Sequence, residues 1–192
     1  MESEECAVWG AYPTIELGSM RRILVCGLSG AGKSTLSRAL AERLGLRYVE
    51  LDALFHKPNW VDAPDEEFIP AVQAAIEGDG WVVDGNYRKV RDIVWDKADT
   101  FIWLDYSLPR ILYRCTLRTT LRCLRREVLW SGCRERFWAQ FLTRDGLIIY
   151  TLRTRAERHR VFSEMIQKAE FEQKAAFHFR RPRAAEEWLA SI

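Results

Sequence analysis

The chain has 192 residues and a formal net charge of +2, and 48% of its residues are hydrophobic. These values indicate one globular domain that can bury a full core, and they exclude a polycation that binds nucleic acid through its overall charge. The sequence has no apolar run near the roughly 20 residues of a membrane-spanning helix, so no membrane partner is expected. Five cysteines without metal-binding spacing indicate reduced thiols and a cytoplasmic protein.

The first 20 residues differ from the rest of the chain. They lack the basic start and the apolar core of a secretory signal. We expect residues 1–20 to be a disordered extension, and residues 21–192 to form a single domain.

Apolar runs alternate with helical patterns along residues 21–192, which is typical of an α/β fold with a parallel sheet. Strands are expected at 23–26, 48–51, 81–83, 101–104 and 176–179. Helices are expected at 34–44, 65–77, 90–96, from 109 onward, twice within 134–167, and at 183–192. Pro70 lies inside one of these helical patterns, where a proline normally starts or breaks a helix.

The sequence GLSGAGKST at residues 27–35 matches the phosphate-binding pattern G-x-x-x-x-G-K-[ST]. Such a loop wraps an anion with backbone N–H groups, while its lysine reaches the outer phosphates and its hydroxyl binds Mg²⁺. The predicted strand before it and the helix after it are the context that the motif requires. We therefore expect ATP and Mg²⁺ to bind here, and a glycine-rich turn that matches by chance is the alternative. The expected cofactor-binding residues are Gly27, Ser29, Gly30, Ala31, Gly32, Lys33, Ser34 and Thr35, with Ser34 on the metal.

Three acids, Asp52, Asp84 and Asp105, each end a predicted strand. Because ligands of open α/β sheets bind beyond the carboxyl ends of the strands, all three are expected to point toward the nucleotide. Asp84 begins the run DGNYR and is the candidate for orienting Mg²⁺, directly or through water. Asp105 precedes Ser107 and Pro109, and capping of the next helix is the better interpretation there.

The segment 110–160 is rich in arginine and contains no lysine. Its first part carries arginines at four-residue intervals, Arg110, Arg114, Arg118, Arg122 and Arg126, which form a curved stripe along a helix. Such a run of like charges is tolerated when anions neutralise part of it, and Arg binds phosphate oxygens bidentately. We expect an Arg-rich helical lid at about 118–160 that excludes water from phosphoryl transfer. A solvated helix face is the alternative.

Trp130 and Trp138 flank a break in the helical pattern at residues 131–132. This arrangement fits the tip or hinge of a lid. It fits equally well a helix–turn–helix hairpin whose tryptophans lie in the core.

Together these segments resemble the P-loop kinases of the nucleoside monophosphate kinase type. Among them the chain is most similar to a bacterial group of small adenylate-kinase-like proteins, often named topology modulation proteins. The blocks that carry the resemblance are GLSGAGKSTLSRALAERLG, ELDALFHKPNW, WVVDGNYRKVR, ADTFIWLDY, RTTLRCLRRE and FRRPRAAEEWL, within residues 21–192. Adenylate kinases follow the acid of strand three with Gly-Phe-Pro-Arg, whereas this chain has Gly-Asn-Tyr-Arg at 85–88.

The resemblance implies a three-layer P-loop NTPase fold with a five-stranded parallel sheet of order 2-3-1-4-5 and helices on both faces. That order places Asp84 beside the phosphate-binding loop. The resemblance also implies that the loop at Arg181 lines the adenine, and that the segment after strand two forms the acceptor site.

The stretch LDALFHKPNW at residues 51–60 combines a carboxylate, an imidazole, an ammonium group and an indole. In the kinases that this chain resembles, an acid at the position of Asp52 binds a substrate hydroxyl and accepts its proton. His56 is a candidate for a second polar contact to the acceptor, or else it caps backbone carbonyls of a turn. Trp60 is a candidate for covering a ring or sugar face, or else it anchors the loop in the core. Asn86 and Arg88 complete the candidate acceptor site.

The sequence therefore predicts an ATP-dependent phosphotransferase for a small-molecule acceptor. The candidate catalytic residues are Lys33, Asp52, Arg88, Arg118 and Arg122, and Arg114 is expected to contact ATP. One alternative is a nucleic-acid-linked ATPase or end kinase, although nucleic acid is not the favoured partner. Another is a regulatory ATPase without an acceptor. We expect a monomer or a homodimer.

Overall fold

The computed structural model describes residues 20–133 and 147–192. Its main sheet has five parallel strands in the order β2-β5-β1-β6-β7, which confirms the predicted order 2-3-1-4-5. The strands are β1 (Arg22–Gly27), β2 (Arg47–Glu50), β5 (Trp81–Asp84), β6 (Thr100–Leu104) and β7 (Ala175–Phe179). All five form where apolar runs were found, because strands that are covered on both faces read as continuous hydrophobic segments.

Helices and short turns connect these strands. The helices are α1 (Lys33–Leu44), α2 (Leu51–Phe55), α3 (Asp65–Ala75), α4 (Arg91–Lys97), α5 (Leu108–Leu124), α7 (Leu147–Phe171) and α8 (Pro182–Ser191). Single 3₁₀ turns are η2 (Pro58–Trp60), η3 (Arg88–Val90) and η4 (Trp130–Gly132). A two-stranded antiparallel hairpin joins β3 (His56–Lys57) to β4 (Val61–Asp62).

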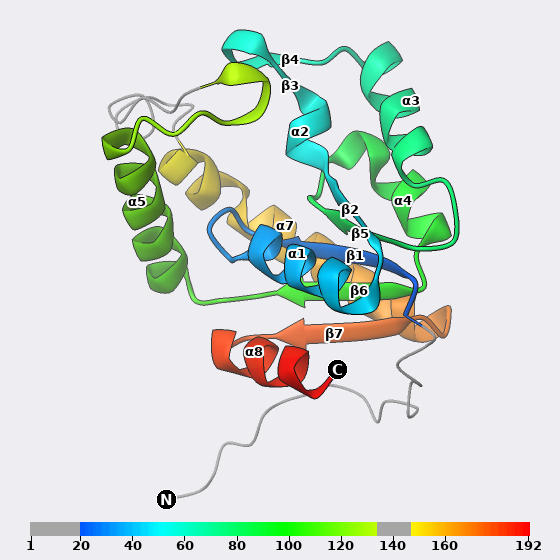
Figure 1. Cartoon of the computed structure of the whole chain (residues 1–192). Helices are drawn as coiled ribbons and strands as arrows, with labels where there is room; N and C mark the ends of the chain where they lie inside the picture. Colours follow the sequence, from blue (N-terminus) through cyan, green and yellow to red (C-terminus); the bar gives the residue numbers. More distant parts are fainter. Residues whose placement is uncertain (1–19, 134–146) are drawn as a thin grey trace, which may run out of the picture.

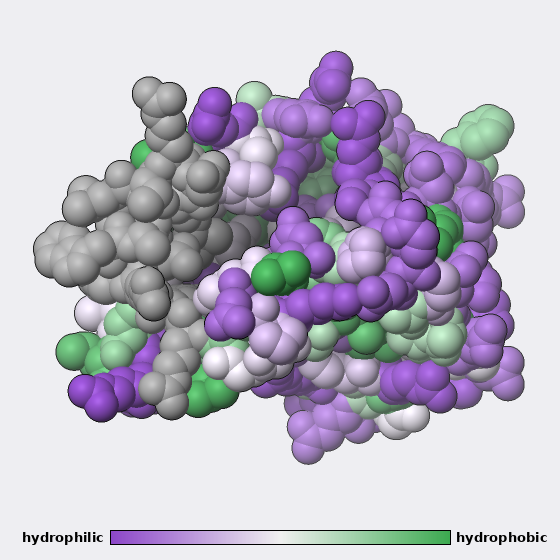
Figure 2. Space-filling model, turned by 90° about the horizontal axis from the view of Figure 1, so that it is seen from above, coloured by the Kyte–Doolittle hydropathy of each residue, from purple (hydrophilic) through white to green (hydrophobic). Residues whose placement is uncertain are grey.

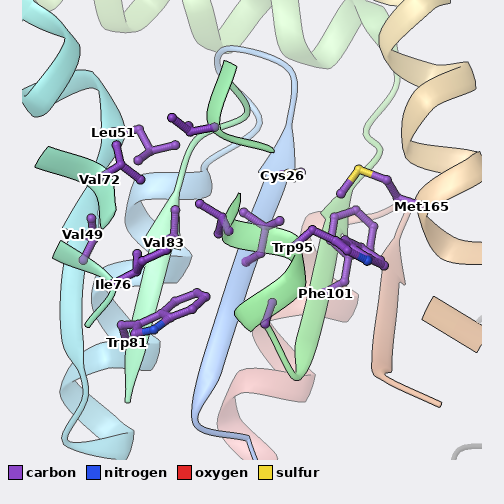
Figure 3. Close-up of a cluster of buried hydrophobic side chains, with 14 of the residues drawn as sticks. Cys26, Val49, Leu51, Val72, Ile76, Trp81, Val83, Trp95, Phe101 and Met165 are labelled. Carbon is purple, nitrogen blue, oxygen red and sulfur yellow. The ribbon is translucent and has the colours of Figure 1, made fainter. Parts of the chain in front are cut away.

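The sheet is covered by helices on both faces, as the sequence predicts (Figure 1). On one face, α3, α4 and α7 pack against the strands through Phe68, Trp95 and Phe162, in the cluster of which Figure 3 shows a part. On the other face, α1, α5 and α8 contribute Leu40, Ile111 and Ala185. The sheet and the helices on its two faces form three layers. The loops that follow the strands meet at the carboxyl edge of the sheet.

The sheet register brings three chain segments together at that edge. Gly27 at the end of β1 lies opposite Leu104 of β6, and Val25 lies opposite Asp84 of β5. In the sheet register, Asp84 lies opposite Glu50 at the end of β2. The phosphate-binding loop and two acids are therefore neighbours because of strand order alone.

Three details differ from the sequence prediction. The second strand ends at Glu50 and not at residue 51, because Leu51 begins α2 and is buried against Gly85. The helix expected at 65–77 forms and continues through Pro70, but it ends at Ala75. Of the two helices expected within 134–167, the structure describes the continuous α7, and residues 134–146 of the predicted lid lie outside the described residues. The expected extension at residues 1–19 also lies outside them.

Within residues 20–133 and 147–192, no helix combines the length and the apolar character that crossing a bilayer requires. The face shown in Figure 2 is mostly hydrophilic, with apolar side chains scattered among charged ones. The four described cysteines form no disulfide with one another.

Candidate active site

The phosphate-binding loop is held in a conformation that glycine favours. Gly30 and Gly32 have φ angles of +82° and +95°, which side-chain-bearing residues rarely adopt. A Cβ atom on Gly30 would lie 2.4 Å from the Cys115 sulfur, and one on Gly32 would lie 3.0 Å from a guanidinium nitrogen of Arg114. The loop is thus packed tightly under α5, and α1 begins directly after it at Lys33. Ala31 is buried in the core and Gly27 closes β1.

Asp84 is the buried acid beside this loop, with only 5% of its surface exposed. Burial raises the pKa of its carboxyl above the ordinary value, and the charge of Lys33 and a hydrogen bond from Ser34 act in the opposite direction. The Tyr48 hydroxyl donates to Asp84 Oδ2 at 3.3 Å. Lys33 Nζ donates to the Leu28 carbonyl oxygen at 3.3 Å. A buried carboxylate, a lysine and a hydroxyl therefore meet at one point.

Three arginines of the predicted stripe, Arg114, Arg118 and Arg122, point into the space above the loop. Arg118 Nη2 donates to Ser29 Oγ at 3.5 Å, whereas the buried Arg118 Nε has no hydrogen-bond partner within residues 20–133 and 147–192. Arg122 Nε lies 3.6 Å from Glu127 Oε1. Arg110 and Arg126, at the two ends of the stripe, are exposed.

Asp52 lies in the first turn of α2, two residues beyond the end of β2, and not directly at a strand end as expected. The half-buried hydroxyl of Tyr87 donates to Asp52 Oδ1 at 2.6 Å. This contact joins α2 to the segment that follows β5. Burial and the negative charge of Asp52 raise the pKa of the Tyr87 hydroxyl, so Tyr87 remains a proton donor to this carboxylate.

The hairpin β3–β4 meets the turn η4, which follows α5 (Figure 1). Ser131 Oγ donates to the His56 carbonyl oxygen at 2.7 Å. The Trp60 backbone N–H donates to the Cys133 sulfur at 3.3 Å, and the Cys133 thiol donates to the Lys57 carbonyl oxygen at 3.4 Å. The stretch at residues 51–60 therefore contacts residues 131–133, which follow α5.

These parts enclose one continuous cavity of about 790 Å³. Its lining comes from the phosphate-binding loop, α1, residues 50–60, the end of β5, α5 and η4. The lining residues are Ser29, Gly30, Gly32, Lys33, Ser34, Thr35, Arg38, Ala39, Glu42, Glu50, Asp52, His56, Trp60, Asp84, Arg114, Arg118, Arg122 and Trp130. The structure therefore brings most of the predicted site residues into a single space.

Three residues whose side chains were predicted to contact a ligand do not line this cavity. Asn86 is half-buried in the segment after β5, and Arg88 is exposed in η3. Arg181 is exposed at the start of α8. Their proposed contacts to acceptor and adenine stay predictions.

The prediction that Asp105 caps the next helix is wrong. Ser107 precedes α5, and no side chain caps that helix. Asp105 Oδ2 instead lies 3.0 Å from His178 Nε2 and 3.5 Å from His159 Nε2. The two imidazoles come from β7 and α7, far along the chain, so the local sequence around Asp105 carried no sign of them.

Several residues of the site were not among the predicted site residues, and four of them make informative contacts. Arg38 follows Ser34 by one helical turn, and its guanidinium binds Glu50 Oε2 at 3.1 Å. Glu50 ends β2, so the strand-end rule used for the other acids could have found it. Tyr87 stands in the DGNYR run, but its contact to Asp52 depends on tertiary structure. Trp130 was left open between a lid tip and a core residue, and it lines the cavity.

The donor set fits a nucleoside triphosphate with Mg²⁺. The loop has the phosphate-binding pattern and is followed directly by the N-terminus of α1, and the buried Arg118 Nε has no hydrogen-bond partner among the described residues. The described residues contain no group of three or more acids, histidines or cysteines that could bind a metal alone. That suits Mg²⁺, which takes one or two carboxylates and fills its remaining positions with water and phosphate oxygens. Asp84 and Ser34 are the residues that would hold it.

Comparison with known families and proteins gives three kinds of match. A family model described as an AAA domain matches residues 23–120. A bifunctional pantoate ligase/cytidylate kinase of Synechococcus sp. (strain WH7803) is 41% identical over 59 residues, which are 29% of this chain and only 12% of that protein. A shikimate kinase of Persephonella marina (strain DSM 14350 / EX-H1) is 30% identical over 116 residues, which are 50% of this chain and 68% of that protein. A gluconokinase structure from Sinorhizobium meliloti 1021 aligns with a TM-score of 0.47 and 22% identity, covering 90% of this chain and 93% of that one.

Proposed function

The chain belongs to the AAA domain family, whose model matches half of its residues, and from this premise we propose that it is an ATP-dependent kinase. In this proposal it transfers the γ-phosphoryl group of ATP to a hydroxyl group of a small molecule. The single observation that carries the proposal is the shared cavity, whose lining contains both the phosphate-binding loop and Asp52. The sequence relatives named as kinases agree with it.

In the proposed reaction, ATP supplies the phosphoryl group and Mg²⁺ neutralises charge on the phosphates. The acceptor oxygen forms a bond to phosphorus while the bond from phosphorus to the ADP oxygen breaks. Asp52 takes the proton of the acceptor hydroxyl through the carboxylate oxygen that Tyr87 does not occupy. Lys33, Arg118 and Arg122 stabilise the negative charge around the transferred group.

Within this class we place the chain in the bacterial adenylate-kinase-like group that its sequence blocks resemble. We favour a hydroxylated metabolite over a nucleoside monophosphate as the acceptor. The reason is that the short helix α2 and a hairpin with two residues in each strand lie between β2 and α3. We further propose a cytoplasmic location and a monomeric or homodimeric state, both on the sequence arguments above.

The test is ADP release from Mg²⁺-ATP with pooled acceptors: monosaccharides, cyclic polyols, sugar acids, nucleosides and nucleoside monophosphates. We expect one pool to raise turnover many-fold. Asp52→Asn should reduce the stimulated rate by about 10²–10⁴-fold, the usual contribution of a general base. Asp96→Asn, which changes an exposed acid of α4, is the matched control and should retain the stimulated rate. If no pool raises ADP release, the proposed function is wrong.

A further inference from the structure

Three aromatic rings form a wall of the cavity on the side of Asp52. Trp130 stacks on His56, with ring centroids 5.9 Å apart and an interplanar angle of 28°. Trp60 meets Trp130 edge to face at 6.3 Å and 85°, and it meets His56 at 5.3 Å and 72°. All three residues line the same cavity as Asp52. Two of the rings come from the hairpin and one comes from the segment after α5, so the wall exists only where these two segments meet.

The backbone that presents this wall is strained. Asn59, Trp60 and Ser131 have φ angles of +62°, +61° and +53°. The left-handed region is disfavoured for any residue with a side chain, and it is a clear outlier for one as bulky as tryptophan. Such strain persists where the surrounding structure fixes it, most often at functional sites. Here the Trp60 N–H bond to Cys133 and the Ser131 hydroxyl bond to His56 fix it.

The ring geometry excludes one class of ligand from between the rings. A flat base that is inserted between two parallel rings needs a gap of about 7 Å, twice a carbon–carbon contact of about 3.5 Å. The nearly parallel pair of His56 and Trp130 is closer than that, and the two indoles are perpendicular. A ligand at this wall therefore lies against the rings, because the gaps between them are too small for an inserted nucleobase.

Both acceptors and donors of hydrogen bonds line the cavity together with these rings. The acceptors are the carboxylates of Asp52, Glu50 and Glu42, and among the donors Arg38 is already paired with Glu50. An ionised carboxylate is only an acceptor, so it selects ligands that donate several O–H groups. Aromatic faces carry partial negative charge and attract the C–H groups of a saturated carbon ring.

From this combination we propose that the wall formed by His56, Trp60 and Trp130 binds the carbon skeleton of a saturated, polyhydroxylated acceptor, a monosaccharide or a cyclic polyol. Its hydroxyl groups bind to Asp52 and Glu50, and one of them receives the phosphoryl group. Only the phosphoryl transfer in this assignment rests on the proposed function, because binding of the acceptor needs no ATP. Trp130 is then a specificity-determining residue supplied by the segment that follows α5.

The experiment measures binding separately from turnover. Intrinsic tryptophan fluorescence of the full chain is titrated with pooled monosaccharides, pooled cyclic polyols and pooled nucleoside monophosphates, in the absence of ATP. We expect a saturable change with one of the first two pools and a weaker one with nucleotides. Trp130→Phe and Trp60→Phe should each weaken that binding about tenfold or more. Trp188→Phe, an indole of α8 that packs on Phe177 and Phe179, is the matched control and should bind as the wild type does.

Turnover then separates the two proposals. With the pool that binds, Trp130→Phe should raise KM for the acceptor about tenfold while kcat changes by less than about threefold. The proposal is overturned if neither polyol pool binds, if Trp130→Phe and Trp60→Phe bind it as tightly as the wild type, or if nucleoside monophosphates bind most tightly. If a polyol binds through these tryptophans but never stimulates ADP release, the binding assignment stands and the kinase proposal fails.

Discussion

Asp52 shows how one contact can turn an ordinary acid into a candidate base. Its Oδ1 accepts the Tyr87 hydroxyl at 2.6 Å, which leaves the second oxygen for a ligand in the cavity. Tyr87 is itself held by the rings of Phe55 and Phe68, at 4.5 Å and 5.3 Å between centroids. Because tyrosine has few rotatable bonds and its ring is packed, the hydroxyl fixes the direction of the carboxylate. We interpret Tyr87 as a positioning residue for Asp52.

Tyr87→Phe should keep the ring and lose this hydrogen bond. A hydrogen bond to a charged group is worth about 1.5–3 kcal/mol, which corresponds to about tenfold to a hundredfold in rate. We expect kcat with a stimulating acceptor to fall by that factor while KM for the acceptor stays within about twofold. Steady-state measurement of ADP release separates the two constants.

A double-mutant cycle with Asp52→Asn tests whether the effect passes through that carboxylate. In the Asp52→Asn background, Tyr87→Phe should have almost no further effect. Tyr113→Phe, at a tyrosine of α5 that is 69% exposed, controls for loss of a phenol elsewhere. Additive losses in the cycle would show that Tyr87 acts on something other than Asp52.

The residues that sequence could predict are those whose role is set by local spacing. The pattern at 27–35 requires a strand before it and a helix after it, and both form. Asp84 followed from the end of an apolar run, and Arg114, Arg118 and Arg122 followed from four-residue spacing. The contacts of Tyr87 and Asp105 could not be predicted, because each partner lies 35 or more residues away and no local pattern links them.

At the scale of elements, the packing of α5 on the phosphate-binding loop decides the shape of the nucleotide site. Cys115 Sγ donates to the Ser29 carbonyl oxygen at 3.2 Å, and the loop glycine next to it approaches this sulfur closely. One face of α5 is thus buried on the loop, and the adjacent face carries the arginines of the cavity. The distance between loop and helix sets where those arginines stand over the phosphates.

Gly30→Ala should therefore disturb nucleotide binding more than its small size suggests. The new Cβ would meet the Cys115 sulfur at 2.4 Å and the Ile111 carbonyl oxygen at 3.1 Å, so α5 must move. We expect the affinity for Mg²⁺-ATP, measured by calorimetry, to fall at least tenfold. Gly45→Ala is the matched control, because Gly45 also has a positive φ but has open space around its Cβ position.

The control should lose about 1–2 kcal/mol of stability from backbone strain alone and keep its affinity for nucleotide. If both variants bind nucleotide as the wild type does, α5 does not constrain the loop. Replacing Cys115 by alanine in the Gly30→Ala chain removes the sulfur contact but leaves the carbonyl contact. It should therefore restore binding only in part.

The elements themselves were predictable in proportion to their length. The five apolar strands and the longer helices follow from continuous or periodic hydrophobic patterns. The hairpin β3–β4 has two residues in each strand, too few for any periodicity to appear. Its conformation depends on η4, which approaches it from more than 65 residues further along the chain. Such an arrangement is determined by tertiary contacts, so a local sequence pattern cannot predict it.

At the scale of the whole molecule, the site concentrates charges that the folded chain does not fully neutralise. Asp84 is almost completely buried, and burial is the main reason why its pKa is raised. Arg118 has a buried N–H that finds no partner in the described part of the chain. Each of these groups disfavours the folded state when it is charged and uncompensated. A metal ion and phosphate oxygens would compensate both, so the stability of the fold should depend on pH and on nucleotide.

The sign of the pH effect follows from linkage. A carboxyl whose pKa is higher in the folded chain binds its proton more tightly there, so folding stability falls as pH rises from the ordinary value of 3.8 through the raised value. Without Mg²⁺ and nucleotide, the melting temperature of the wild type should therefore fall relative to that of Asp84→Asn across this window.

At 100 times its Kd, Mg²⁺-ATP should stabilise the wild type by about 2.7 kcal/mol, which raises Tm by roughly 5–10 °C for a chain of this size. In the wild type, EDTA should abolish the part of that increase that depends on the metal ion. Asp84→Asn should lack this part, whereas Asp96→Asn should behave like the wild type in both the pH series and the nucleotide measurement. Parallel pH profiles for wild type and Asp84→Asn, with equal stabilisation by Mg²⁺-ATP, would show that Asp84 neither carries an unfavourable buried charge nor holds the metal.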